Sequence, residues 1–301
     1  MNYVLVIVAP GQGAQTPGFL SSWLEIPEFR DRISAWSQIV ELDLIEYGTK
    51  ADAERIRDTA VAQPLLVAAA LASFELLNVR PDIVAGHSVG ELAAAAIAGV
   101  ITPEEALALV RERGRAMAEA AAVTKTGMVA VLGGDEAEVL AAIEKHGLTP
   151  ANINGAGQIV AGGTVEQLEA LKAEPPKRAR LIPLSVAGAF HTVHMAPAVE
   201  RLAKAVADLS PSDPPVTLLS NRDGAAVSSG KEFLDRLVSQ VADPVRWDKC
   251  MATMAERGVT TMIELLPGGT LTGLARRGLP GVRTVAIKTP ADLEAAREVL
   301  A

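Results

Sequence analysis

Apolar residues form short runs in the first hundred positions of the chain, and longer apolar stretches lie between and after these runs. The runs at 3–8 and 82–85 are bounded by proline or glycine and are rich in valine and isoleucine, which favours buried strands. The stretches at 64–77 and 91–98 are rich in alanine and leucine, which favours helices. Strands that alternate with helices in this way predict a parallel sheet covered by helices.

The pattern changes at about residue 124. From there it predicts, in order, a strand, a helix, two short strands or a hairpin, a helix and a strand, at 127–132, 135–146, 152–161, 165–173 and 179–186. This βαββαβ order predicts a small ferredoxin-like subdomain at 124–189. Three further strands return the chain to the first sheet, at 216–220, 262–265 and 284–287. We therefore expect one large α/β catalytic subdomain made of 1–123 and 190–301, into which the small one is inserted.

Two glycine-flanked turns follow predicted strands, GQGAQ at 11–15 and GHSVG at 86–90. Ligands of parallel sheets bind beyond the carboxyl ends of the strands, so both turns could face one crevice. A serine between two glycines at a strand-to-helix turn is typical of the nucleophile elbow of α/β-hydrolases. The expected fold class is therefore α/β, with an α/β-hydrolase-like parallel sheet and an inserted ferredoxin-like (βαββαβ) subdomain.

Composition and charge narrow the function classes. The chain has 301 residues, 49% of them hydrophobic, and a formal net charge of −8, so no overall positive field attracts nucleic acid or an anionic membrane surface. Cys250 is the only cysteine, which excludes an intramolecular disulfide and suits a reducing compartment. The N-terminal apolar run has no basic residue before it and is shorter than a spanning segment of roughly 20 residues. The uncharged stretch 59–74 contains Gln63 and Pro64 and fits a core helix better than a membrane span. We expect a cytoplasmic protein with no nucleic-acid or membrane partner.

Ser88, in the centre of GHSVG, is a candidate nucleophile. The glycines two residues away on each side allow a strained turn and a close approach of strand and helix. The helix that follows points its free N–H groups at the serine, where an oxyanion would form. The alternative role for Ser88 is a helix N-cap.

A serine nucleophile needs a base, and the chain has four histidines. His87 adjoins Ser88 on a tight turn, where neighbouring side chains usually point apart, so we expect a structural role for it. His146 ends a predicted helix, where a cation is favourable. His191 follows the last strand of the small subdomain and the flexible Gly188, and we expect it to be the base, with His194 as the second choice.

The third member of a serine triad has no clear candidate. Asp135 is the only aspartate between Ser88 and His191, and its place at a predicted helix start already explains it. A backbone or amide carbonyl could therefore orient His191, giving an enzyme that forms an acyl-serine but activates water less readily.

Arg113 lies inside an apolar helical stripe. The sequence TPEE at 102–105 is a capping box with proline at the first helical position, so a helix begins there. Spacing of three and four residues places Arg113 among alanine, leucine, valine and methionine on one face, whereas Arg111 and Arg115 fall on the other face with glutamates in reach. A buried guanidinium needs an anion, which is either a structural ion-pair partner or a carboxylate of the substrate.

The motifs together resemble a known family, the malonyl-CoA:acyl carrier protein transacylases of fatty acid synthesis, and the related acyltransferase domains of polyketide synthases. The matching stretches occur in the family's order and cover nearly the whole chain: PGQGAQ (10–15), AQPLL (62–66), GHSVGE (86–91), RGRAM (113–117), NINGAGQIVAGG (152–163), GAFHT (188–192), SQVADPVRW (239–247) and ELLPGGTLTGL (264–274).

The resemblance implies a role for each catalytic residue. Ser88 would be the acylated nucleophile and His191 its base, with His191 oriented by the main-chain carbonyl of Gln240. The backbone N–H groups of Gln12 and Val89 would form the oxyanion hole.

The resemblance also implies the substrate contacts. Arg113 would bind the free carboxylate of malonate, and Gln63 would help to hold the site. Asn154 and Gln158 would lie near the cleft, with turn-forming amides as the alternative. Phe190 resembles the malonyl-selective pattern, because it would crowd the carbon that carries the extra methyl group of methylmalonyl.

The activity implied is ping-pong transfer of malonyl from malonyl-CoA, through Ser88, to the phosphopantetheine thiol of an acyl carrier protein, without metal or redox cofactor. We expect a monomer whose acidic carrier docks on a local basic patch, for which the candidates are 177–180 and Arg276 with Arg277. Three alternatives stay open: a serine hydrolase or thioesterase of acyl-CoA, a transacylase for malonate decarboxylase or a polyketide assembly line, and a noncatalytic docking module.

Overall fold

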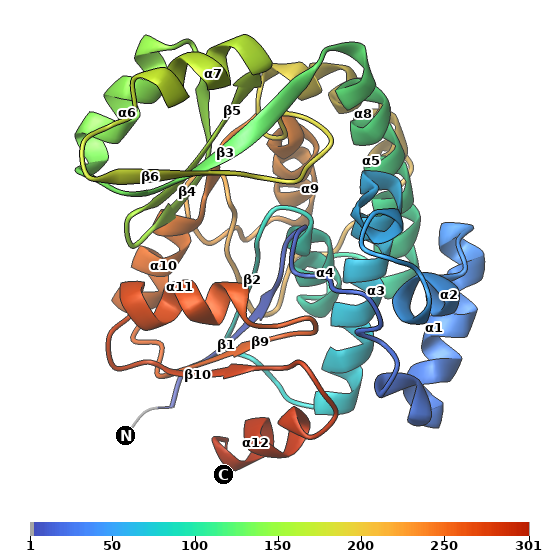
Figure 1. Cartoon of the computed structure of the whole chain (residues 1–301). Coiled ribbons are helices and arrows are strands. Elements are labelled where there is room, and N and C mark those ends of the chain that lie inside the picture. The colour runs from blue at the N-terminus through green and yellow to red at the C-terminus, as the bar shows by residue number, and fades with distance from the viewer. Residues whose placement is uncertain (1–2, 301) are drawn as a thin grey trace.

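The computed structural model describes residues 3–300, so residues 1, 2 and 301, the ends of the predicted catalytic subdomain, lie outside the described residues. Two five-stranded sheets organise the molecule, one above the other in Figure 1. The first is wholly parallel, in the order β10-β9-β1-β2-β7. Its strands are β1 (Leu5–Ala9), β2 (Ile83–Gly86), β7 (Thr217–Leu218), β9 (Thr261–Glu264) and β10 (Arg283–Ala286).

The second sheet is mixed, in the order β6-β3-β5-β4-β8. Neighbours are antiparallel except β4 and β8, which run parallel. Its strands are β3 (Thr126–Gly133), β4 (Thr149–Gly155), β5 (Gln158–Thr164), β6 (Ala179–Pro183) and β8 (Val245–Arg246). The fifth strand thus comes from outside the predicted insert. The protein is therefore an α/β fold with one parallel and one mixed sheet.

Helices cover both faces of the parallel sheet because its central strand is apolar on both sides. On β1, Leu5, Ile7 and Ala9 pack into one core, whereas Val6 and Val8 pack into another. The first core is closed by helices α1 (Pro27–Val40), α3 (Thr59–Leu77), α4 (Gly90–Ile97), α5 (Pro103–Val123), α8 (Ala196–Ala207) and α9 (Gly230–Ser239). The second is closed by α10 (Trp247–Glu256) and α11 (Thr270–Gly278).

The remaining helices lie toward the outside. Helices α6 (Glu136–Lys145) and α7 (Val165–Ala173) pack on one face of the second sheet and close a third core with it. Helix α2 (Leu44–Thr49) lies beside α1, and α12 (Asp292–Glu298) lies at the opposite end of the molecule from α6 and α7 (Figure 1).

Most predicted elements are present, and the differences lie at their ends. The helix expected at 64–77 begins five residues earlier, at Thr59, because the Asp58 side chain caps it by accepting from the Ala60 N–H; Pro64 lies inside it. The strand expected at 179–186 ends at Pro183, and the one expected at 216–220 pairs only over Thr217–Leu218 at the sheet edge.

Within residues 3–300, α3 is the one helix long and apolar enough to cross a membrane by length and composition, and most of it is buried inside the protein. It packs between α1, α4 and α5 in the first core, as expected for a core helix.

Candidate active site

Ser88 lies on a tight turn between β2 and α4. Its φ of 52° is in the left-handed region, which costs energy for a residue with a side chain. A Cβ added at Gly86 would overlap the backbone of Gly90, and one added at Gly90 would overlap the Ala9 carbonyl. The two glycines are therefore required by close backbone approach, as the elbow pattern predicts.

His191 contacts Ser88 and is itself held by a main-chain carbonyl. The Ser88 Oγ lies 2.7 Å from His191 Nε2, and His191 Nδ1 lies 2.7 Å from the Gln240 carbonyl oxygen. Because a carbonyl only accepts, Nδ1 carries the proton and Nε2 is left to accept from the Ser88 hydroxyl. The side chain that the sequence predicts as the base thus lies in hydrogen-bond contact with Ser88, and its other partner among residues 3–300 is a carbonyl and not a carboxylate.

The environment of His191 favours its neutral form. The side chain is almost completely buried, in the short segment before η3 (Val193–Met195). Burial, and then the positive charge of Arg113, lower the pKa of His191 to about 3. A neutral imidazole is the form that can accept the Ser88 proton.

Arg113 reaches the same site from α5. Its guanidinium is buried, with Nη1 donating to Gln63 Oε1 at 2.7 Å and Nη2 donating to Gln240 Oε1 at 2.7 Å. The Nη2 also lies 3.3 Å from the Ser88 Oγ. Arg113, which helical spacing predicts to be buried, therefore lies beside the candidate nucleophile Ser88.

No carboxylate neutralises Arg113 directly. Among residues 3–300 it forms no ion pair within 4.0 Å, and its hydrogen-bond partners are neutral oxygens. Its Nε is buried without a partner among these residues. Burial lowers the pKa of Arg113 to about 10, so it stays charged at neutral pH. The sequence left two possible anions for Arg113, a structural ion-pair partner and a carboxylate of the substrate. Residues 3–300 supply no structural ion-pair partner.

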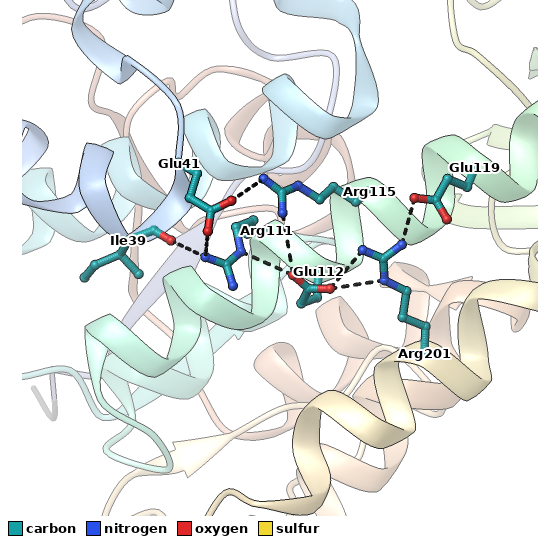
Figure 2. Close-up of polar contacts among 7 residues, drawn as sticks. All are labelled: Ile39, Glu41, Arg111, Glu112, Arg115, Glu119 and Arg201. Carbon is teal, nitrogen blue, oxygen red and sulfur yellow. Dashed lines mark hydrogen bonds and ion pairs between the residues drawn. The ribbon is translucent and has the colours of Figure 1, made fainter.

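The opposite face of α5 is fixed by surface ion pairs (Figure 2). Glu41, at the end of α1, accepts from Arg111 at 2.9 Å and from Arg115 at 2.8 Å. The network consists of Ile39, Glu41, Arg111, Glu112, Arg115, Glu119 and Arg201. Since Arg201 lies on α8, the network joins α5 to two neighbours and helps to hold the helix that carries Arg113. The sequence suggested glutamates near Arg111 and Arg115 but not Glu41, which is about seventy residues away in the chain.

A pocket of about 230 Å³ opens over Ser88 and His191, between the two sheets. The residues named from the sequence that line it are Gln12, Gln63, Asn154, Gln158 and Phe190. Asn154 Oδ1 accepts from His87 Nε2 at 2.9 Å, so His87 joins the elbow to β4. Val89, Arg113 and Gln240 are buried and do not line the pocket, although Arg113 reaches Ser88 from α5. The role of the Gln12 and Val89 N–H groups in an oxyanion hole stays a prediction.

The other two histidines lie elsewhere. His146 ends α6, as expected, and His194 lies in η3; neither lines the pocket. Across residues 3–300, no group of three or more His, Cys, Asp or Glu side chains is placed to hold a metal ion.

Two buried residues at the site were missed from the sequence. Asn221 accepts from the Ser88 N–H at 2.8 Å through Oδ1 and donates to the Gly86 carbonyl at 2.7 Å through Nδ2. Its side chain is therefore hydrogen-bonded to the first and the central residue of the turn. Glu91 accepts from the Asn221 N–H at 2.6 Å. Glu91 ends the matching stretch GHSVGE and lies in the first turn of an alanine-rich helix, but neither signal assigned it a role, and Asn221 lies in none of the matching stretches.

The chain is similar to known proteins over nearly its whole length. The family model described as acyl transferase domain matches residues 6–291. The malonyl CoA-acyl carrier protein transacylase of Mycobacterium tuberculosis (strain ATCC 25618 / H37Rv) is 53% identical over 297 residues, which are 97% of this chain and 98% of that protein.

Solved structures have the same fold over nearly the whole chain. The crystal structure of the Mycobacterium tuberculosis MCAT has a TM-score of 0.94 at 53% identity and covers 98% of this chain and 99% of that one. A malonyl-transacylase solved in complex with its type II PKS acyl-carrier protein has a TM-score of 0.92 at 31% identity, with 98% and 99% coverage. The chain therefore belongs to the acyl transferase domain family, among the malonyl CoA-acyl carrier protein transacylases, and is an acyltransferase.

Proposed function

We propose that this enzyme transfers malonyl from malonyl-CoA to the phosphopantetheine thiol of an acyl carrier protein and so supplies fatty acid synthesis. The observation that carries the proposal is the 3.3 Å distance between the Arg113 guanidinium and the Ser88 Oγ, with no carboxylate paired to Arg113 among the described residues. A short acyl group on Ser88 that ends in a carboxylate would reach that cation.

The reaction proceeds in two half-reactions through a malonyl-serine. His191 takes the Ser88 proton as the oxygen attacks the thioester carbonyl, and the imidazolium then returns the proton to the departing CoA thiolate. In the second half, His191 takes the proton of the carrier thiol, whose sulfur attacks the ester, and Ser88 regains its proton. All groups come from the chain and its substrates, so the chemistry needs no metal or redox cofactor.

Arg113 selects the acyl group by its charge. The malonyl carboxylate replaces one or both amide oxygens of Gln63 and Gln240 on the guanidinium. A charge-assisted bidentate pair is stronger than the two bonds to neutral amides, and it forms only with a dicarboxylic monothioester.

A polyketide carrier is the second candidate acceptor. It is supported by the complex in which a related malonyl-transacylase holds a type II PKS acyl-carrier protein. A hydrolase is less favoured, since the His191 Nδ1 partner is a neutral carbonyl that stabilises an imidazolium less than a carboxylate would. The basic residues at 177–180, and Arg276 with Arg277 at the end of α11, stay the proposed docking sites for an acidic carrier.

The two sheets also suggest a finer description of the fold. We infer that 124–189 form a ferredoxin-like subdomain, supported by the antiparallel order β6-β3-β5-β4 and the element order βαββαβ. The parallel sheet with its strained serine turn supports an α/β-hydrolase-like catalytic subdomain in 1–123 and 190–301.

A transfer assay tests the proposed function. Purified enzyme is given malonyl-, methylmalonyl- or acetyl-CoA together with a phosphopantetheinylated carrier protein, and the acylated carrier is measured by mass spectrometry. Malonyl is expected to be transferred fastest, with little free malonate formed. Release of free acid faster than carrier acylation would instead support a hydrolase.

The low pKa of His191 predicts a pH profile without an acid limb near neutrality. The base is active when neutral, and with a pKa of about 3 it stays neutral as the pH falls through the ordinary histidine value of 6.5. Burial raises the pKa of Glu91, close to this site, to about 8, so the rate of Ser88 acylation is expected to be flat below that value, between about pH 7 and pH 5. Stopped-flow release of CoA measures it, with His194→Ala as the matched histidine control. A limb with its midpoint near the ordinary histidine value would contradict the assignment.

Phe190 is expected to limit the size of the acyl group. Its side chain lines the pocket directly before His191, and truncation to alanine opens space beside the carbon that bears the methyl group of methylmalonyl. We expect Phe190→Ala to raise the methylmalonyl-to-malonyl ratio of kcat/KM by about tenfold or more. The control is Phe233→Ala, which truncates a buried phenylalanine on α9 that does not line the pocket. An unchanged ratio in Phe190→Ala would mean that other residues set this preference.

A further inference from the structure

Glu91 is a buried residue whose backbone N–H donates to the Ser88 carbonyl at 3.0 Å, while its carboxyl group is bonded to neither Ser88 nor His191 among residues 3–300. It is 2% exposed, in the first turn of α4. Its Oε1 accepts from the Asn221 N–H at 2.6 Å, and its Oε2 accepts from Gln240 Nε2 at 2.5 Å. Among residues 3–300 no cation pairs with it within 4.0 Å. Its hydrogen bonds lead instead into the Ser88 turn and toward Arg113.

The side-chain amide of Gln240 links Glu91 to Arg113 by hydrogen bonds. Its Nε2 faces acceptors, namely Glu91 Oε2 at 2.5 Å and the Ser88 carbonyl at 3.1 Å. The amide must then present its Oε1 on the other side, where it accepts from Arg113 Nη2 at 2.7 Å. A reversed amide would place a donor against the guanidinium and lose a charge-assisted bond. The acceptors around Gln240 Nε2 therefore determine that Gln240 Oε1, and not Nε2, faces Arg113.

The amide also keeps the Glu91 carboxyl group out of contact with Arg113. Burial raises the pKa of Glu91 to about 8, against the hydrogen bonds from Asn221 and Gln240 and the charge of Arg113. In its ionised form Glu91 raises the pKa of Arg113. A carboxylate in direct contact would neutralise Arg113 and compete with a substrate carboxylate. With Gln240 between them, the hydrogen-bond partners of the guanidinium among residues 3–300 are neutral oxygens.

We propose that Glu91 is a positioning residue for acyl-group selection: by fixing the Gln240 amide, it holds Arg113 aimed at Ser88 while leaving it free to bind the carboxylate of the acyl group. This inference rests on the proposed function, in which that carboxylate is malonyl. It assigns to Glu91 an effect on the preference for malonyl over acetyl, which a purely structural carboxylate would not have.

Two variants test the proposal through the ratio of kcat/KM for malonyl-CoA to that for acetyl-CoA. Glu91→Gln replaces one acceptor by a donor and opposes the observed amide orientation, so the ratio should fall about tenfold or more, mainly through a higher KM for malonyl-CoA. The double variant Glu91→Gln/Gln240→Glu exchanges carboxylate and amide and keeps the formal charge. It brings a carboxylate onto Arg113, so its ratio should fall further.

Glu264→Gln is the matched control. Glu264 is also completely buried, but its carboxylate accepts from N–H groups at the start of α11. We expect this control to lower the melting temperature without changing the ratio. If Glu91→Gln does not fold, the double variant decides the question, because it retains both a carboxylate and an amide. A wild-type ratio of kcat/KM in the two Glu91 variants would overturn the inference. Equal losses of kcat/KM with malonyl-CoA and acetyl-CoA would also overturn it. So would failure of both variants to fold, because Glu91 would then be structural.

The same assay separates this inference from the proposed function. If wild-type enzyme shows no preference for malonyl, or if Arg113→Ala loses both donors equally, the proposed function fails. If Arg113→Ala removes the preference while both Glu91 variants keep it, only the role of Glu91 is refuted.

Discussion

Ser88→Ala is expected to abolish the malonyl-enzyme and to lower carrier malonylation by about four orders of magnitude or more. The reason is that Ser88 Oγ is the group hydrogen-bonded to the base at 2.7 Å and within reach of the Arg113 cation at 3.3 Å. The loss in stability should be small, about 1–2 kcal/mol, because alanine removes only the hydroxyl's hydrogen bonds with His191 and Arg113 and keeps the strained backbone. Intact-protein mass spectrometry after incubation with malonyl-CoA measures the adduct, and a thermal melt checks the fold.

Ser73→Ala is the matched control for this result. Ser73 is a buried serine on α3 whose hydroxyl donates to the Ala70 carbonyl at 2.9 Å, outside the pocket residues. It should keep the malonyl adduct in full. A persistent adduct in Ser88→Ala would identify another nucleophile and refute the assigned mechanism.

Arg113→Ala is expected to reduce kcat/KM for malonyl-CoA about a hundredfold or more, and for acetyl-CoA far less. Each charge-assisted bond of the guanidinium to the malonyl carboxylate contributes about 1.5–3 kcal/mol, and the acetyl group has no carboxylate to lose. The measurement is the rate of CoA release with each donor, under single-turnover conditions and in the presence of carrier protein.

Arg111→Ala provides the comparison on the same helix. Arg111 lies on the opposite face of α5 in the surface network of Figure 2, so its removal changes packing and charge without reaching the pocket. It should leave the ratio of malonyl to acetyl transfer unaltered. Equal losses with the two donors in Arg113→Ala would mean that Arg113 only supports the structure.

The parts of the site that could be predicted are those encoded by local patterns. The turn at Ser88 follows from two glycines spaced around a serine after an apolar run. The burial of Arg113 follows from helical periodicity and from the capping box at Thr102, which fixes where the helix begins. The strand at 82–85 and the helix at 91–98 were located to within one residue at each end.

The parts that could not be predicted depend on contacts between distant segments. Asn221 reaches Ser88 across 133 positions, and Gln240 reaches Arg113 across 127. The main-chain acceptor at Gln240 came only from the family resemblance, because any residue type has a carbonyl. Its side chain, which joins Arg113 to Glu91, had no signal of its own. The second sheet likewise gained β8 from beyond the predicted insert, since a two-residue strand has no detectable periodicity.

Malonyl selection requires that an acyl chain on Ser88 extend to the Arg113 guanidinium, which lies 3.3 Å from the Ser88 Oγ. A crystal structure of the enzyme soaked with malonyl-CoA in the absence of carrier protein shows whether it does. We expect a malonyl ester on Ser88 Oγ whose free carboxylate forms a two-pronged hydrogen bond with Arg113 in place of one or both of its amide partners. A malonyl ester whose carboxylate points away from Arg113, or malonyl attached to another residue, would contradict it.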